Sequence, residues 1–178
     1  MRDGAHIRVG IDSQCLSYLI DAFSAVGSPT DTLAAQKIAL ARLFFYLPGT
    51  LWVTPTVAVE CAKIRNTERA ELHASFIAVL FCELPVTDTK ATEERSQNLL
   101  KLHSGLNDCR IVAEAEYVGF DVLLTFDSKM VKRLSGSSTV KLLEPLTYWK
   151  LLAIPQGAKP DKTPHETNPL TEQSWWRW

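Results

Sequence analysis

The sequence predicts an α/β fold in which helices flank both faces of a mostly parallel central sheet. Short apolar segments rich in β-branched residues alternate along the chain with segments of helical periodicity. This alternation is typical of parallel sheets built from strand–helix–strand units. The segment 121–126 is almost continuously apolar, as expected for a strand that is buried on both faces. We therefore expect a three-layer domain.

The first half of the chain begins with a predicted strand at 6–11, where apolar β-branched residues alternate with other residues. A helix follows over 13–26, and Gly27 closes it, because glycine is common just after the last helical turn. Pro48 and Gly49 end the second helix. The other elements expected in this half are a strand at 50–53 and helices at 30–47, 54–64 and 68–80.

The second half is predicted to contain the most buried strand and the helix that leads into it. Asp108 lies in the first turn of that helix, and Gly119 is its natural end. Asp127 then caps a short helix. The expected elements are strands at 84–86, 121–126 and 139–143 and helices at 91–102, 108–118, 128–134 and 145–152.

The last residues differ in composition from the rest, so we expect a domain at 1–154 and a tail at 155–178. The tail has four prolines, few aliphatic residues and a terminal cluster of three tryptophans. Prolines interrupt regular helices and interior strands, so the tail should be extended and at most loosely docked. Because tryptophan rings are large apolar surfaces, we interpret this tail as an interaction segment outside the core that docks on this protein, on a second copy or on another chain. The alternative is a disordered end whose tryptophans have no role.

The composition argues against a strongly basic nucleic-acid-binding protein, a membrane-spanning protein and a zinc ribbon. Lys plus Arg number 19 and Asp plus Glu number 20, which gives a net charge of -1 and leaves only a local basic patch for nucleic acid. No apolar run reaches the roughly 18 residues of a membrane span, and the first residues lack a signal peptide pattern. The four cysteines form no C-x-x-C pair, so we expect buried thiols in a reducing cytoplasm rather than a zinc ribbon.

Four carboxylates stand at positions where strands end or helices begin. Asp12 follows the first strand, Asp127 follows the most buried strand, and Asp108 opens a helix. Glu60 lies in the helix after the second strand and is long enough to reach inward. In open α/β sheets the ligand crevice lies outside the carboxyl ends of the strands. We therefore expect these side chains to converge on one crevice.

Converging carboxylates repel one another, and a divalent cation is the usual relief. A site of oxygen ligands suits Mg²⁺ or Mn²⁺, which can activate water and stabilise a leaving oxygen of a phosphodiester. Each acid also has an ordinary structural explanation, because aspartates cap helices and favour helix N-termini. Glu60 could equally be a solvated helix residue.

Three segments of the chain can be compared with known families: Val9–Ser13, Thr54–Glu60 and the block from Asn107 to Ala115 that continues through Gly119 to Asp127. Together they resemble the PIN-domain ribonucleases, a family that includes the VapC-type toxins. The last block is the most specific, and the resemblance covers about residues 6 to 144. Gln14 stands where the family often has Asn, and the tail makes the chain longer than a minimal VapC toxin.

The resemblance implies a PIN-like domain over 1–154 that acts as a metal-dependent endoribonuclease, hydrolysing RNA phosphodiesters with Mg²⁺ or Mn²⁺. It implies catalytic roles for Asp12, Glu60, Asp108 and Asp127, with the three aspartates as metal ligands. The residues expected to support them are Ser13, Asn107 and Thr125. The partners implied are RNA, an antitoxin protein if the chain is the toxin of a pair, and a second copy of the chain.

Basic side chains near these acids are the candidate RNA contacts. Lys63 and Arg65 follow Glu60, whereas Arg110 and Lys129 each follow one of the aspartates. Such groups can hold phosphates near an acidic centre, although each could also be ordinary solvated surface. We expect two histidines, His73 and His103, to lie on helices at the surface or half-buried.

Two other functions compete with a nuclease. An α/β phosphatase would use Asp12 as a nucleophile, but that chemistry normally needs a second Asp two residues later, where Gln14 stands. A catalytically inactive PIN-like module that binds RNA or protein would keep the fold without turnover. Loss of metal-dependent RNA cleavage in an Asp12→Asn variant would distinguish the nuclease from the inactive module.

Overall fold

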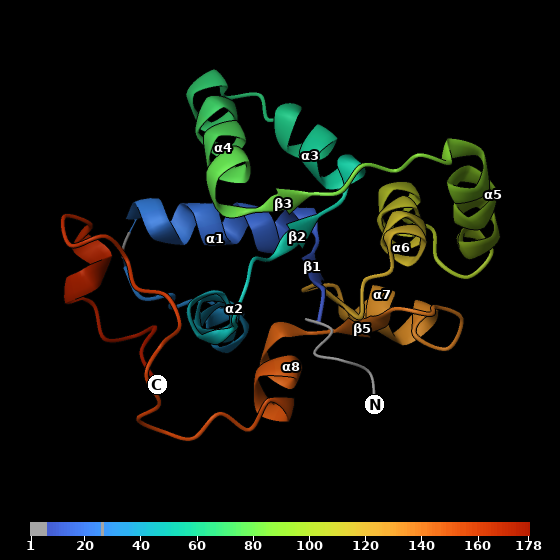
Figure 1. Cartoon of the computed structure of the whole chain (residues 1–178). Coiled ribbons are helices and arrows are strands. Elements are labelled where there is room, and N and C mark those ends of the chain that lie inside the picture. The colour runs from blue at the N-terminus through green and yellow to red at the C-terminus, as the bar shows by residue number, and fades with distance from the viewer. Residues whose placement is uncertain (1–6, 26) are drawn as a thin grey trace.

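The computed structural model describes residues 7–25 and 27–178, and a five-stranded sheet lies at its centre (Figure 1). The strand order is β3-β2-β1-β4-β5, and every described pair of neighbouring strands is parallel. The strands are β1 (Val9–Ile11), β2 (Trp52–Val53), β3 (Cys82–Glu83), β4 (Val122–Leu124) and β5 (Lys141–Leu143). The predicted α/β class with a parallel sheet is confirmed.

Helices cover both faces of the sheet and give the three-layer arrangement. In Figure 1, α3 and α4 lie above the sheet, α2 and α8 pack together below it, and α5 lies beside α6. The helices are α1 (Ser13–Ala25), α2 (Ala34–Tyr46), α3 (Pro55–Ala62), α4 (Thr67–Leu80), α5 (Thr89–Leu100), α6 (Leu106–Val118), α7 (Ser128–Leu134) and α8 (Pro145–Leu151). The expected ends at residues 6 and 26 fall outside the described residues.

Local sequence signals explain where several elements end. Gly119 ends α6 with a positive φ of 74°, a conformation that glycine adopts without steric cost. Asp127 caps α7 through the backbone N–H groups of Lys129 and Met130. The strand expected at 84–86 forms two residues earlier: Leu84 still donates to the Val53 carbonyl, but Pro85 has no N–H with which to continue the ladder.

The core runs continuously between the sheet and the helices. Ile11, Leu123 and Leu124 of the central strands are fully buried. Cys15, Cys61 and Cys109 are buried free thiols, as expected, and burial raises the pKa of Cys61 to about 11. The side chain of Cys82 lies outside the described residues.

The C-terminal tail packs on the domain, so the expectation of loose docking is wrong. Trp176 is completely buried, and its ring centroid lies 4.3 Å from that of Phe45 on α2. Leu170, in the short 3₁₀ helix Pro169–Glu172, belongs to the same core. Trp178 stands perpendicular to Trp149 of α8. The tail therefore covers a groove of its own chain with apolar rings.

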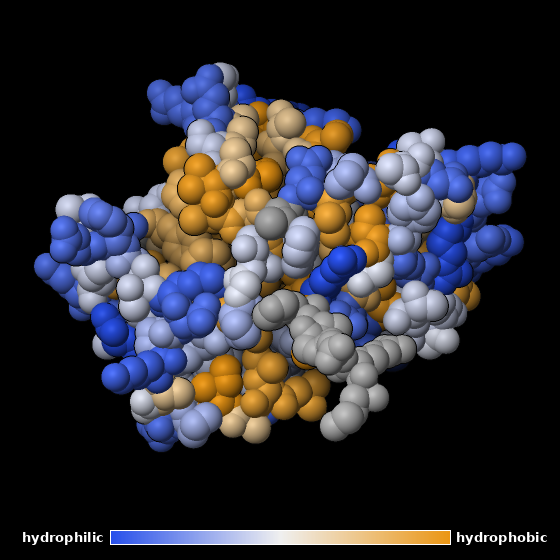
Figure 2. Space-filling view, in the orientation of Figure 1, coloured by the Kyte–Doolittle hydropathy of each residue, from blue (hydrophilic) through white to orange (hydrophobic). Residues whose placement is uncertain are grey.

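Part of the surface is apolar. Figure 2 shows apolar side chains gathered over α4 and the neighbouring edge of the sheet. The large apolar side chains of α3 and α4 that are exposed are Val59, Leu72 and Val79. None of the helices in the described part of the chain combines the length and apolar character needed to cross a membrane.

Candidate metal centre

Two of the predicted acids stand at the same edge of the sheet because β1 and β4 are parallel neighbours. Ile11 is in register with Leu124, and the Asp12 N–H donates to the Leu124 carbonyl at 3.0 Å. Asp127 follows β4 by three positions and reaches the same edge. The ends of parallel strands therefore place Asp12 and Asp127 at the same edge of the sheet.

The Asp12 carboxyl group is buried, with an exposed fraction of 7%. Burial raises its pKa above the ordinary value, and the negative charge of Asp108 adds to the rise. Hydrogen bonds from the Thr125 hydroxyl and the Cys15 N–H oppose it. The ionised form of Asp12 is thus costly unless a positive charge lies nearby.

Thr125 links the two aspartates. Its side chain is completely buried and hydrogen-bonds the Asp12 carboxyl group, while its Oγ1 accepts the Asp127 N–H at 2.9 Å. Thr125 thereby fixes the distance between the end of β1 and the start of α7. Its role in supporting a metal site stays a prediction.

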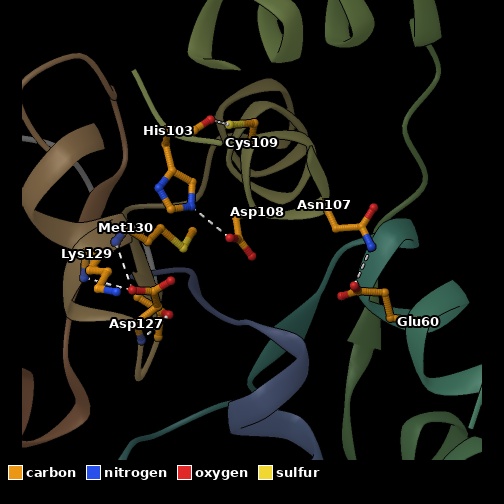
Figure 3. Close-up of polar contacts among 9 residues, drawn as sticks. Glu60, His103, Asn107, Asp108, Cys109, Asp127, Lys129 and Met130 are labelled. Atoms are coloured by element: carbon orange, nitrogen blue, oxygen red, sulfur yellow. Dashed lines mark hydrogen bonds and ion pairs between the residues drawn. The ribbon is translucent and has the colours of Figure 1, made fainter. Parts of the chain in front are cut away.

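Asp108 projects from the first turn of α6, where its side chain is 39% exposed. Its Oδ2 atom lies 2.8 Å from Nε2 of His103 (Figure 3). We expected His103 on a helix, at the surface or half-buried. It lies instead in the loop between α5 and α6 and is buried, with an exposed fraction of 6%. His73 is likewise fully buried, although it lies on α4 as predicted. In both cases packing by neighbouring elements overrides the polarity of the imidazole.

Three side chains form a compact group of potential ligands. One ligand atom from each of His103, Asp108 and Asp127 lies within 4.8 Å of the other two. In the part of the chain that the structure describes, Asp12 and Glu60 do not join this group at that distance. The structure therefore brings two of the three expected aspartate ligands together and adds a histidine, whereas Asp12 is linked to the group by its electrostatic interaction with Asp108.

Glu60 lies on the opposite side of Asp108 from Asp127 (Figure 3). Its two carboxylate oxygens accept hydrogen bonds from the Ser13 hydroxyl and from the Asn107 amide, the latter at 2.5 Å. Ser13 and Asn107 are neighbours of the two aspartates Asp12 and Asp108 in the sequence. Ser13 and Asn107 therefore hold the Glu60 carboxylate, and their role in supporting a metal site stays a prediction.

Sequence reasoning missed Glu114, a buried residue of α6 that holds α3 in place. Its carboxylate accepts the Thr56 N–H at 3.0 Å and the Thr56 hydroxyl at 2.7 Å, and it is 4% exposed. A negative charge at a helix N-terminus is favourable because the helix dipole is positive there. This contact fixes the helix that carries Glu60 against the helix that carries Asp108.

The four basic residues that are candidate RNA contacts differ in their exposure and in their ion pairs. Lys63 and Arg65 are exposed beyond the end of α3. Arg110 lies 3.8 Å from Glu93 and 3.6 Å from Glu114, so its charge is partly neutralised. Lys129 is exposed, and its backbone N–H donates to Oδ1 of Asp127 at 2.7 Å. Lys129 therefore adjoins Asp127 through its backbone.

This donor set fits a divalent cation. Carboxylate oxygens with one imidazole nitrogen are ordinary ligands for Mn²⁺ and related ions, and the partial exposure of Asp108 leaves room for water and phosphate. Gly105 keeps the space open: a Cβ atom there would lie 2.0 Å from Oδ2 of Asp108 and 2.8 Å from Nε2 of His103. The cluster of Asp108, Asp127 and buried Asp12 also supplies the negative charge that such an ion neutralises.

Comparisons with known proteins do not assign the chain to a family. No protein-family model matches the chain, and no curated protein matches it significantly. The fold and the geometry of the acidic site are therefore what any functional argument must use.

Proposed function

We propose that the chain is a metal-dependent endoribonuclease of the PIN-domain type. The observation that carries the proposal is the meeting of Asp108 and Asp127 beside Asp12 at the carboxyl edge of a parallel sheet. A bound Mg²⁺ or Mn²⁺ would lower the pKa of a coordinated water and polarise a phosphodiester. The order of these acids along the chain, which resembles the PIN family, extends the proposal from metal binding to RNA.

The residues of the site would have different roles in this reaction. Asp108 and Asp127 would hold the cation, and Asp12 would add its charge from behind. Glu60 is fixed by Ser13 and Asn107, so its carboxylate would orient the attacking water without having to reorganise. Exposed Lys129 would hold a phosphate next to Asp127.

The decisive test compares wild type with Asp108→Asn on single-stranded RNA, with Mg²⁺, with Mn²⁺ and in excess EDTA. We expect cleavage by the wild type with metal only, and no detectable cleavage by the variant. The free energy of unfolding of the variant should change by less than about 1 kcal/mol, because the side chain is partly exposed and an amide oxygen can still accept from His103.

Asp161→Asn is the matched control, since Asp161 is an exposed aspartate of the tail. It should leave cleavage unchanged. Full activity in EDTA, or cleavage by Asp108→Asn at the wild-type rate, would contradict the proposal. RNA binding without cleavage by the wild type would favour the inactive module instead.

The partners and the location implied by the resemblance stay predictions. If the chain is a toxin, its expression should stop bacterial growth, and Asp108→Asn should restore growth without any antitoxin. A cytoplasmic location agrees with the buried free thiols, since a reducing compartment preserves them. A second copy of the chain remains a predicted partner.

A further inference from the structure

We propose that His103 is a ligand of the metal and that the site therefore binds Mn²⁺ and related transition ions more tightly than Mg²⁺. This inference rests on the proposed function, because it concerns the same metal centre. It assigns a role to a residue that the four-acid pattern in the sequence does not contain.

The distances are close to those that a single ion requires. Two ligands at about 2.1 Å from one ion lie at most about 4.2 Å apart. The ligand atoms of His103, Asp108 and Asp127 already lie within 4.8 Å of one another. Small side-chain rotations would bring the three atoms onto one cation.

The burial of His103 points to the same conclusion. The imidazole is 6% exposed, and its Nδ1 atom has no hydrogen-bond partner among the described residues. Its Nε2 atom is directed at Asp108, inside the ligand group (Figure 3). Coordination at Nε2 would replace the contact with Asp108 and give this nitrogen a strong partner.

Gly105 makes the approach of the imidazole possible. A Cβ atom at this position would overlap the Asp108 carboxylate and the nitrogen of His103 that faces it. The loop between α5 and α6 can therefore turn closely enough to place a histidine beside the first turn of α6. Any other side chain at position 105 would push the two ligands apart.

An imidazole changes which ion the site prefers. Carboxylates alone suit Mg²⁺ and Mn²⁺, whereas a nitrogen ligand adds affinity for transition ions. Mg²⁺ gains little from the nitrogen because it is a harder cation. The wild type should thus bind Mn²⁺ more tightly than Mg²⁺, and Co²⁺ more tightly than Mn²⁺.

The test measures metal binding without RNA. Mn²⁺ bound to the full-length wild type should show coupling to a histidine nitrogen in pulsed electron paramagnetic resonance. His103→Gln, which keeps a polar oxygen-bearing side chain, should lose this coupling and bind Mn²⁺ at least about tenfold more weakly. Its affinity for Mg²⁺ should change much less. His165→Gln, at an exposed histidine of the tail, is the control and should retain both signals.

Even if the His103 variant fails to fold, the wild-type spectrum can overturn the assignment. Absence of nitrogen coupling in the wild type, or coupling that persists in a folded His103→Gln protein, would overturn it. Nitrogen coupling that disappears in His103→Gln, in a wild type that does not cleave RNA, would support His103 as a ligand while overturning the proposed nuclease function.

Discussion

The buried His73 makes the stability of the folded protein sensitive to acid. Its side chain on α4 is fully buried, neither ring nitrogen has a hydrogen-bond partner among the described residues, and Asp21 lies 3.9 Å from Nε2. Burial lowers its pKa, and Arg69 adds to this effect while Asp21 opposes it. The unfolded chain therefore takes up a proton at higher pH than the folded chain does. Stability is fully present above the ordinary histidine pKa of 6.5 and is lost as pH falls below it.

We predict that His73→Leu raises the melting temperature of the metal-free protein, and raises it more at pH 5 than at pH 8. At both pH values the change removes an unsatisfied buried group, which costs about 1–3 kcal/mol. At pH 5 it also removes the proton uptake that favours unfolding. Thermal unfolding at the two pH values measures the effect, and His165→Leu in the tail should show no such difference. An equal gain at both pH values would contradict the assigned pKa shift.

The acidic residues of the site were predictable one by one, whereas the histidine was not. Asp12 and Asp127 follow strands that were recognisable from apolar runs, and parallel strands end at one edge. His103 carries no comparable signal, because its position depends on how closely the chain turns at Gly105. A lone histidine near a turn is usually a surface residue, and only the packed loop distinguishes this one.

At the level of elements, the contact between α3 and α6 sets the position of Glu60. We predict that Glu114→Ala lowers the free energy of unfolding by about 2 kcal/mol or more, because it leaves the Thr56 N–H and hydroxyl without their buried acceptor. Cleavage should also fall, since α3 would lose its anchor. Urea unfolding and an RNA cleavage assay measure the two effects.

Glu93→Ala is the matched control for Glu114→Ala. Glu93 is an exposed glutamate of α5 whose 3.8 Å contact with Arg110 is a surface ion pair. Such pairs contribute about 0–1 kcal/mol, so this variant should unfold almost like the wild type. Equal losses in the two variants would show that Glu114 does not anchor α3.

Element types followed from the sequence more readily than their ends and order. Alternating apolar segments and caps such as Asp127 predicted the positions of all the described α-helices and of β1, β2, β4 and β5, whereas β3 was expected two residues too late. The order β3-β2-β1-β4-β5 depends on long-range pairing, which no local pattern contains. The early end of β3 reflects a single missing N–H at Pro85.

For the whole molecule, the tail was the main difference from expectation. Its prolines and scarce aliphatic residues resemble a disordered segment, and a composition cannot reveal the groove that receives it. Within 155–178, Trp176 and Leu170 supply the fully buried contacts, and the Trp176 indole N–H donates to the Leu170 carbonyl at 2.9 Å. Lys162 adds contacts to the carbonyls of Phe44 and Leu47 at the end of α2. The tail thus behaves as a part of the folded domain.

We predict that Trp176→Ala lowers the free energy of unfolding by about 3–5 kcal/mol, the usual cost of removing a large buried aromatic side chain. The ring is completely buried against Phe45, so its loss leaves a cavity between the tail and α2. Trp178→Ala is the matched control: its ring is 38% exposed, and its loss should cost less than half as much. Urea unfolding of the three proteins, and of a chain truncated after Leu152, measures the effect. If the truncated chain unfolded at the same urea concentration as the full chain, the tail would be an appendage after all, and its tryptophans would be free to bind another molecule.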